Sequence, residues 1–117
     1  MKNKIAVIGA GSFGTSLAMT LIGKGHEVSI WGRKKSQMEL MRTTLENPHY
    51  LPGIKLPVEL NIVDQMGDAL EGAEIVLFSV PAQQFRTVFT DAKSGLMIFS
   101  AIFSPPYSAY FYDFTTV

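Results

Sequence analysis

The sequence has no cysteine, no excess of charge of either sign and no long apolar run. Without cysteine the chain can form no disulfide, no thiolate zinc site and no cysteine nucleophile. Ten basic and ten acidic side chains give a formal net charge of zero, so no whole-chain field draws the protein to nucleic acid. We therefore expect no nucleic-acid partner, and any anion-binding site must be local.

The apolar runs are too short for a signal peptide or a membrane span. The first run, Ile5–Ile8, ends at Gly9, well short of the ~7 to 15 residues of a signal-peptide core and the ~18 residues that span a bilayer. The sequence therefore predicts no membrane insertion and a soluble, cytoplasmic protein.

The 117 residues provide enough apolar material for one folded domain, with 47% of them hydrophobic and 17% charged. Charge nearly disappears at the C-terminal end, where Asp113 is the one charged residue between Ser94 and Val117 and aromatic residues are frequent. We expect residues 1–101 to form the domain and residues 102–117 to form a distinct aromatic tail.

Short apolar runs alternate with helical patterns along the chain. We predict strands at residues 5–8, 27–31, 60–63, 75–80 and 96–101, and helices from Gly14 to the breakers Gly23 and Gly25, from an N-cap at Ser36 to about Leu45, and at residues 65–70 and 82–92. The segment from Glu46 to Leu60 contains three prolines and is predicted to be a long loop. This alternation predicts an α/β fold with a mostly parallel sheet and helices on both faces.

A glycine-rich motif directly follows the first predicted strand and opens a helix. Gly9, Gly11 and Gly14 fit the pattern G-x-G-x-x-G, in which the glycines allow a tight turn, close approach of a diphosphate and close helix packing. Free amides at the helix start bind an anion without a cationic side chain. We therefore predict that this motif binds a dinucleotide; a purely structural strand–turn–helix is the alternative.

The second predicted strand is followed by cations rather than by an acid. NAD-specific sites usually place Asp or Glu here to bind the ribose 2′-hydroxyl, whereas this chain has Arg33, Lys34 and Lys35. The planar fork of Arg33 suits a 2′-phosphate. We therefore predict a preference for NADP(H) over NAD(H), which is also a possible cofactor; a solvated basic turn is the alternative interpretation.

Five motifs together carry more information than the glycine pattern alone. They are Gly9–Thr15, Gly25–Val28, Trp31–Arg33, Asn47–Ile54 and Val80–Ala82. Together they resemble the N-terminal domain of bacterial NAD(P)-dependent glycerol-3-phosphate dehydrogenase, and the Asn47–Ile54 stretch is the most specific of them. The resemblance extends from about Lys4 to Lys93.

The resemblance implies a Rossmann-type doubly wound domain. It also implies an oxidoreductase that interconverts the small-molecule substrates dihydroxyacetone phosphate and sn-glycerol 3-phosphate by hydride transfer, in phospholipid precursor synthesis. Ser12 and Phe13 match the pair that contacts the cofactor after the second glycine, with Phe13 where tryptophan is commoner.

Four further positions acquire a role through the resemblance. Arg33 and Lys34 match the positions beside the adenosine ribose phosphate, which agrees with the charge argument above. Tyr50 lies in a loop that the family folds near the cofactor, and Pro81 ends the strand that flanks the nicotinamide.

The family pattern is lost after Ala101. The position of the family's reacting lysine is occupied by Phe103, so we expect no catalytic residue in this chain. The family's second, helical domain has no counterpart. We therefore expect apolar surface to be left uncovered and the chain to self-associate. On this interpretation the tail is a truncated or out-of-frame ending. In the alternative, a genuine divergent C-terminus, Tyr110, Tyr112 and Phe114 form an extra strand or bind a partner.

The sequence also leaves two alternative functions open. A non-catalytic dinucleotide-binding module and another Rossmann reductase, similar to ketopantoate reductase, are the alternative functions; the Asn47–Ile54 stretch argues against the second. His26 and His49 are far apart in sequence and lack a carboxylate cluster, so we expect no metal site. Ser79, at the end of a predicted strand, is placed where such sheets bind ligands.

Overall fold

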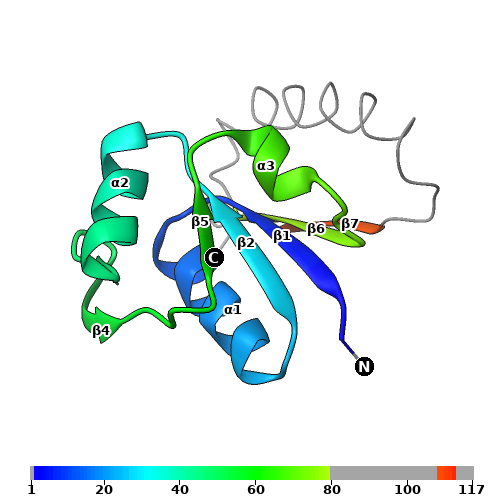
Figure 1. Ribbon diagram of the computed structural model, residues 1–117, viewed down its shortest axis with the longest axis horizontal. Helices are drawn as coiled ribbons and strands as arrows, with labels where there is room; N and C mark the ends of the chain where they lie inside the picture. The colour runs from blue at the N-terminus through cyan, green and yellow to red at the C-terminus, as the bar shows by residue number, and fades with distance from the viewer. Residues whose placement is uncertain (1, 80–107, 113–117) are drawn as a thin grey trace.

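A five-stranded sheet forms the centre of the protein in the computed structural model, which describes residues 2–79 and 108–112 (Figure 1). The strands are β1 (Lys4–Ile8), β2 (Glu27–Trp31), β5 (Asn61–Val63), β6 (Ile75–Ser79) and β7 (Ser108–Tyr112). Their order is β5-β2-β1-β6-β7, and every pair is parallel. The helices are α1 (Ser12–Gly23), α2 (Lys35–Thr44) and α3 (Met66–Leu70). The predicted α/β fold with a mostly parallel sheet is confirmed.

Helices cover both faces of the sheet, so the central strand is buried on both sides. Successive residues of a strand point to opposite faces. On β1, Ile5 and Val7 pack in one core with residues of α1 and α2, whereas Ala6 and Ile8 pack in a second core with residues of α3. Figure 1 shows α1 and α3 on opposite sides of the sheet. This two-sided burial explains why β1 reads as an uninterrupted apolar run.

The order of the strands creates a switch point beside β1. The chain moves outward from β1 to β2 and then to β5, and it returns to the other side of β1 to form β6. Ile8 at the end of β1 is opposite Phe78 of β6. Open α/β sheets bind ligands at the carboxyl ends of the strands where the order reverses. The residues that follow β1 and end β6 therefore lie where a ligand site is expected in this fold.

The predicted C-terminal ends of α1, α2 and α3 are correct to within one residue, but α1 begins at Ser12 rather than at Gly14, and the predicted N-cap at Ser36 is wrong. The first helix ends at Gly23, and Gly25 has the positive φ of a chain reversal, +91°. The second helix begins at Lys35, its N-cap is Lys34, and no side chain caps it. Met38 is fully buried in the first turns of this helix. The N–H of Met38 donates to the carbonyl oxygen of Lys34 at 3.1 Å, so the helix already begins before Ser36 could cap it.

The segment predicted to be a long loop contains two short strands. Strand β3 (Glu46–Asn47) and strand β4 (Leu51–Lys55) form a small antiparallel sheet, which we call the hairpin. The paired residues are Glu46 with Lys55 and Asn47 with Leu51, and the register is irregular between them. Pro52 is not among the paired residues of β4, so the pairing does not need the N–H that proline lacks. The prediction of a loop is thus wrong for these residues.

The backbone of the aromatic tail contributes an edge strand. Strand β7 pairs with β6 in parallel, from Ile75 opposite Ser108 to Ser79 opposite Tyr112. The helix predicted at residues 82–92 and the strand predicted at residues 96–101 lie outside the described residues, and the domain boundary after residue 101 stays a prediction. In residues 2–79 and 108–112 there is no helix with the length and apolarity that a membrane crossing requires.

Close packing at Gly14 sets the position of α1 against the end of β1. A Cβ atom added at Gly14 would lie 2.1 Å from the carbonyl oxygen of Gly9 and 3.1 Å from the hydroxyl of Ser79. The first of these neighbours is backbone and cannot rotate away. Only glycine therefore allows the helix to approach this closely.

We expect Gly14→Ala to lower the free energy of unfolding by about 1–3 kcal/mol or more, the usual cost of overpacking. The control is Gly23→Ala in the same helix, where an added Cβ meets nothing within 4 Å; this change should be neutral or stabilising by up to about 1 kcal/mol. Urea unfolding of the full chain measures both. Equal losses for the two variants would show that the contact at Gly14 does not limit the fold.

Candidate functional site

A tight turn connects β1 to α1 at the switch point. Gly9 has φ +125°, a conformation that L side chains rarely adopt. Its N–H donates to the carbonyl oxygen of Trp31 at 2.7 Å, which ties the turn to the end of β2. The turn is thus held against two neighbouring strands before the helix begins at Ser12.

The start of α1 presents backbone amides without acceptors. The N–H of Thr15 donates to the carbonyl oxygen of Gly11 at 3.0 Å, and no side chain caps the helix. Within the described residues, the N–H groups of Gly11, Ser12 and Gly14 have no hydrogen-bond acceptor. Such amides, together with the positive end of the helix dipole, form an anion-binding surface.

Gly11 leaves open space in front of these amides. An added Cβ would meet no atom of the described residues within 4 Å, and φ is −79°, which any residue adopts. Neither packing nor backbone conformation therefore explains the glycine. A side chain would instead occupy the space through which a ligand reaches the amides.

The carbonyl oxygen of Ala10 points away from this space, into a buried polar network. It accepts hydrogen bonds from Nε2 of Gln37 at 2.7 Å and from Nδ2 of Asn47 at 3.0 Å. Asn47 is 1% exposed, and its Nδ2 also donates to Oγ1 of buried Thr15 at 2.9 Å. The turn is therefore fastened both to α2 and to the hairpin.

The hairpin reaches the start of α1 at a second point. The hydroxyl of Ser12 donates to the carbonyl oxygen of Tyr50 at 2.6 Å. Phe13 and Tyr50 are each 39% exposed, so two large apolar side chains remain accessible beside the turn. Aromatic surface of this kind can pack against the ring systems of a ligand.

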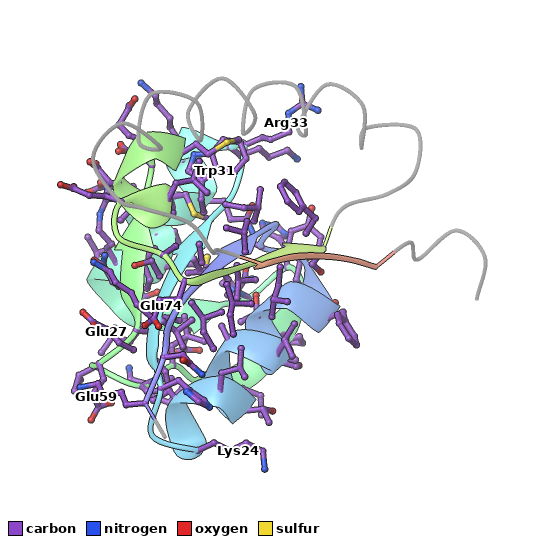
Figure 2. The ribbon with its side chains drawn as sticks, turned by 90° about the vertical axis from the view of Figure 1, so that its right-hand side faces the viewer. Lys24, Glu27, Trp31, Arg33, Glu59 and Glu74 are labelled. Atoms are coloured by element: carbon purple, nitrogen blue, oxygen red, sulfur yellow. The ribbon has the colours of Figure 1, made fainter. Side chains whose placement is uncertain are left out.

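The predicted cations lie on a segment that packs against the turn. A Cβ added at Gly32 would lie 2.9 Å from the Cβ of Ala10, so the residue before Arg33 touches the glycine motif. Arg33, Lys34 and Lys35 are exposed. Figure 2 shows Arg33 beyond the end of β2, at the opposite end of the molecule from Lys24.

The charge of Arg33 is available to a ligand. Arg42 on α2 has carboxylate partners in Glu39 and, at 3.8 Å, Asp64. The hydrogen bond that Arg42 donates to the carboxylate of Glu39 raises the pKa of Arg42 above its ordinary value. No carboxylate in the described part of the chain pairs with Arg33.

Ser79 adds a buried hydroxyl at the end of β6. The residue is 5% exposed, and its Oγ has no hydrogen-bond partner among residues 2–79 and 108–112. An unpaired buried polar group costs free energy unless a ligand or water satisfies it. Unpaired amides, open space at Gly11 and this hydroxyl together fit a diphosphate group.

The two histidines singled out in the sequence take no part in the contacts described above. Pro81 lies outside the described residues. His26 accepts the N–H of Asn3 at Nδ1, 3.1 Å away, and His49 is exposed. Among residues 2–79 and 108–112, no group of three or more His, Asp and Glu residues is placed to hold a metal ion.

Sequence reasoning missed the network around Ala10. Asn47 belongs to the most specific motif, which gave a signal that the residue matters but not what it contacts. Thr15 ends the Gly9–Thr15 motif, which likewise did not indicate its contact, and Gln37 carried no signal. Their contacts with Asn47 and Ala10 join residues 32 and 27 positions apart.

Known proteins share both the sequence and the fold of this chain. The family model described as "NAD-dependent glycerol-3-phosphate dehydrogenase N-terminus" matches residues 4–102. Glycerol-3-phosphate dehydrogenase [NAD(P)+] of Desulfotalea psychrophila is 51% identical over 87 residues, which cover 74% of this chain and 26% of that protein.

Solved structures of the same family superpose on the fold. The crystal structure of glycerol-3-phosphate dehydrogenase from Coxiella burnetii matches with a TM-score of 0.80 and 29% identity, covering 94% of this chain and 32% of that chain. The yeast enzyme from Saccharomyces cerevisiae matches with a TM-score of 0.71 and 27% identity, covering 81% of this chain and 31% of that one.

These relatives are oxidoreductases, and the chain spans about a quarter to a third of their length. Its glycine turn, its strand order and the family match over residues 4–102 agree with one another. The chain belongs to the NAD-dependent glycerol-3-phosphate dehydrogenase family and corresponds to its N-terminal portion.

Proposed function

We propose that this chain is the cofactor-binding part of a glycerol-3-phosphate dehydrogenase and binds a nicotinamide dinucleotide at the glycine turn. The observation that carries the proposal is the open space at Gly11 in front of unpaired N-terminal amides of α1. The reaction of the whole enzyme would interconvert dihydroxyacetone phosphate and sn-glycerol 3-phosphate. Its setting would be the cytoplasm and the synthesis of phospholipid precursors.

In this proposal each part of the site has a separate task. The amides of Gly11, Ser12 and Gly14 donate to the diphosphate, and Gly9 gives the turn its shape. Phe13 and Tyr50 offer apolar contact beside it, and Pro81 borders the nicotinamide side. The bound dinucleotide supplies the hydride. Donation to a charged phosphate is worth about 1.5–3 kcal/mol per hydrogen bond, more than a neutral pair.

The proposed role of the chain is binding rather than turnover. Carbonyl reduction needs a proton donor and cations that hold the substrate phosphate at the reacting carbon. The position that resembles the family's reacting lysine is Phe103. Residues 1–101 would bind the dinucleotide, and residues 102–117 would add no catalytic group. Exposed apolar surface would favour self-association of the chain. We expect the chain to bind NADPH without oxidising it when dihydroxyacetone phosphate is added.

We further propose that the site prefers NADP(H). Arg33 and Lys34 are exposed and follow Gly32, which packs against the turn. A 2′-phosphate adds negative charge at the adenosine end of the dinucleotide. A guanidinium without a carboxylate partner can bind it in a bidentate manner.

Arg33→Ala should weaken NADPH binding roughly 10- to 100-fold, the equivalent of one charge-assisted hydrogen bond or more. NADH binding should stay within about twofold, because NADH lacks the phosphate that Arg33 would contact. Fluorescence titration measures both affinities. The control is Lys24→Ala, which removes the same charge from the opposite end of the molecule. Equal weakening of NADPH and NADH, or equal affinities in the unaltered chain, would contradict the proposed preference.

Gly11→Ala should leave the fold intact but raise the dissociation constant of both dinucleotides by about tenfold or more, because the new methyl group lies where the diphosphate must approach. The cost in unfolding free energy should stay below about 1 kcal/mol, since the methyl group meets no atom within 4 Å in the part of the chain that the structure describes. Gly23→Ala serves as the control and should bind like the unaltered chain. Unchanged affinity in Gly11→Ala would show that no ligand occupies this space.

A further inference from the structure

The orientation of the peptide unit between Ala10 and Gly11 decides whether the turn attracts or repels an anion. In a trans peptide the C=O and the N–H point in opposite directions. If the carbonyl of Ala10 faced the open space at Gly11, its negative end would oppose a phosphate. The carbonyl instead faces Gln37 and Asn47, so the N–H of Gly11 is directed away from them.

Asn47 is the more firmly fixed of the two donors. The residue is 1% exposed, and each hydrogen of its side-chain amide has an acceptor, the carbonyl oxygen of Ala10 at 3.0 Å and Oγ1 of Thr15 at 2.9 Å. Its Oδ1 accepts from Nε2 of Gln37 at 3.2 Å. Because a carbonyl oxygen can only accept, the group facing Ala10 must be the NH₂. The network thus permits one orientation of the amide.

Because residue 11 is a glycine, hydrogen bonds are needed to hold the orientation of the peptide unit between Ala10 and Gly11. A flip of the peptide unit changes ψ of Ala10 and φ of Gly11, and Gly11 has no Cβ that would resist the change. The two hydrogen bonds to Ala10 oppose the flip, and neither brings a charge near the diphosphate. The hairpin that carries Asn47 is itself fastened to α1 by the bond from Ser12 to Tyr50.

We propose that Asn47 is a positioning residue, which holds the carbonyl of Ala10 inward and thereby directs the N–H of Gly11 toward the diphosphate of a dinucleotide. The proposal rests on the proposed function. It extends that function because it gives the hairpin a role in phosphate binding. Asn47 would act through the carbonyl of Ala10 and would not contact the ligand itself.

The test compares Asn47→Ala with Thr15→Val in the full chain. Asn47→Ala removes the donor to Ala10, whereas Thr15→Val keeps that donor and removes only the other acceptor in a side chain of similar shape. Both should lower stability, because both break the buried bond between Asn47 and Thr15. Only Asn47→Ala should weaken NADPH binding, by roughly tenfold or more, while Thr15→Val should stay within about twofold of the unaltered chain.

A second ligand separates positioning from a general loss of structure. Adenosine 2′-monophosphate carries the adenosine and the 2′-phosphate but no diphosphate, so Asn47→Ala should bind it as the unaltered chain does. A parallel loss of affinity for both ligands, or unchanged NADPH affinity, would overturn the positioning role.

If Asn47→Ala does not fold, Gln37→Ala provides the alternative, because Gln37 is partly exposed and also donates to Ala10. It should show the same selective loss for NADPH, to a smaller extent; equal NADPH affinity in this variant would overturn the proposal. Failure of the unaltered chain to bind either dinucleotide would instead refute the proposed function, and this inference with it.

Discussion

The candidate site depends on how one peptide unit is held, the one between Ala10 and Gly11. The carbonyl oxygen of Ala10 is the point at which the turn after β1 meets α2, through Gln37, and the hairpin, through Asn47. Buried polar groups of this kind are costly unless every partner is in place. A turn that served only as a connection would need neither these two donors nor a glycine that faces open space.

The candidate site offers an anion two kinds of group, neutral backbone amides and charged side chains. Backbone amides and the dipole of α1 provide a neutral surface at the glycine turn, and the exposed cations Arg33–Lys35 lie on the adjoining segment. Gly32 joins the two, because its backbone packs on Ala10. A chain with a net charge of zero can therefore hold a strongly anionic ligand. Three of the ten basic residues are consecutive at this one place, which provides a local positive charge despite the zero net charge.

The sequence predicted those features that depend on neighbouring residues. Strands β1 and β6 are mostly apolar and β2 carries Val28, Ile30 and Trp31, and Gly9, Gly11 and Gly14 follow β1 in a fixed spacing. The hairpin escaped prediction because β3 has only two residues and Pro52 argued against a strand in β4. The role of Asn47 escaped because its contact with Ala10 spans 37 positions. Such contacts depend on the folded arrangement of the hairpin, which no local pattern encodes.

Backbone amide resonances of the isotope-labelled chain, followed by NMR during titration with NADPH, report most directly on whether the glycine turn binds the diphosphate. We expect the largest shifts at Gly11, Ser12 and Gly14, smaller shifts at Arg33, and none at Lys24 beyond the far end of α1. If NADPH binds while the amide of Gly11 stays unchanged, the diphosphate is bound elsewhere. The turn would then be a purely structural link between strand and helix.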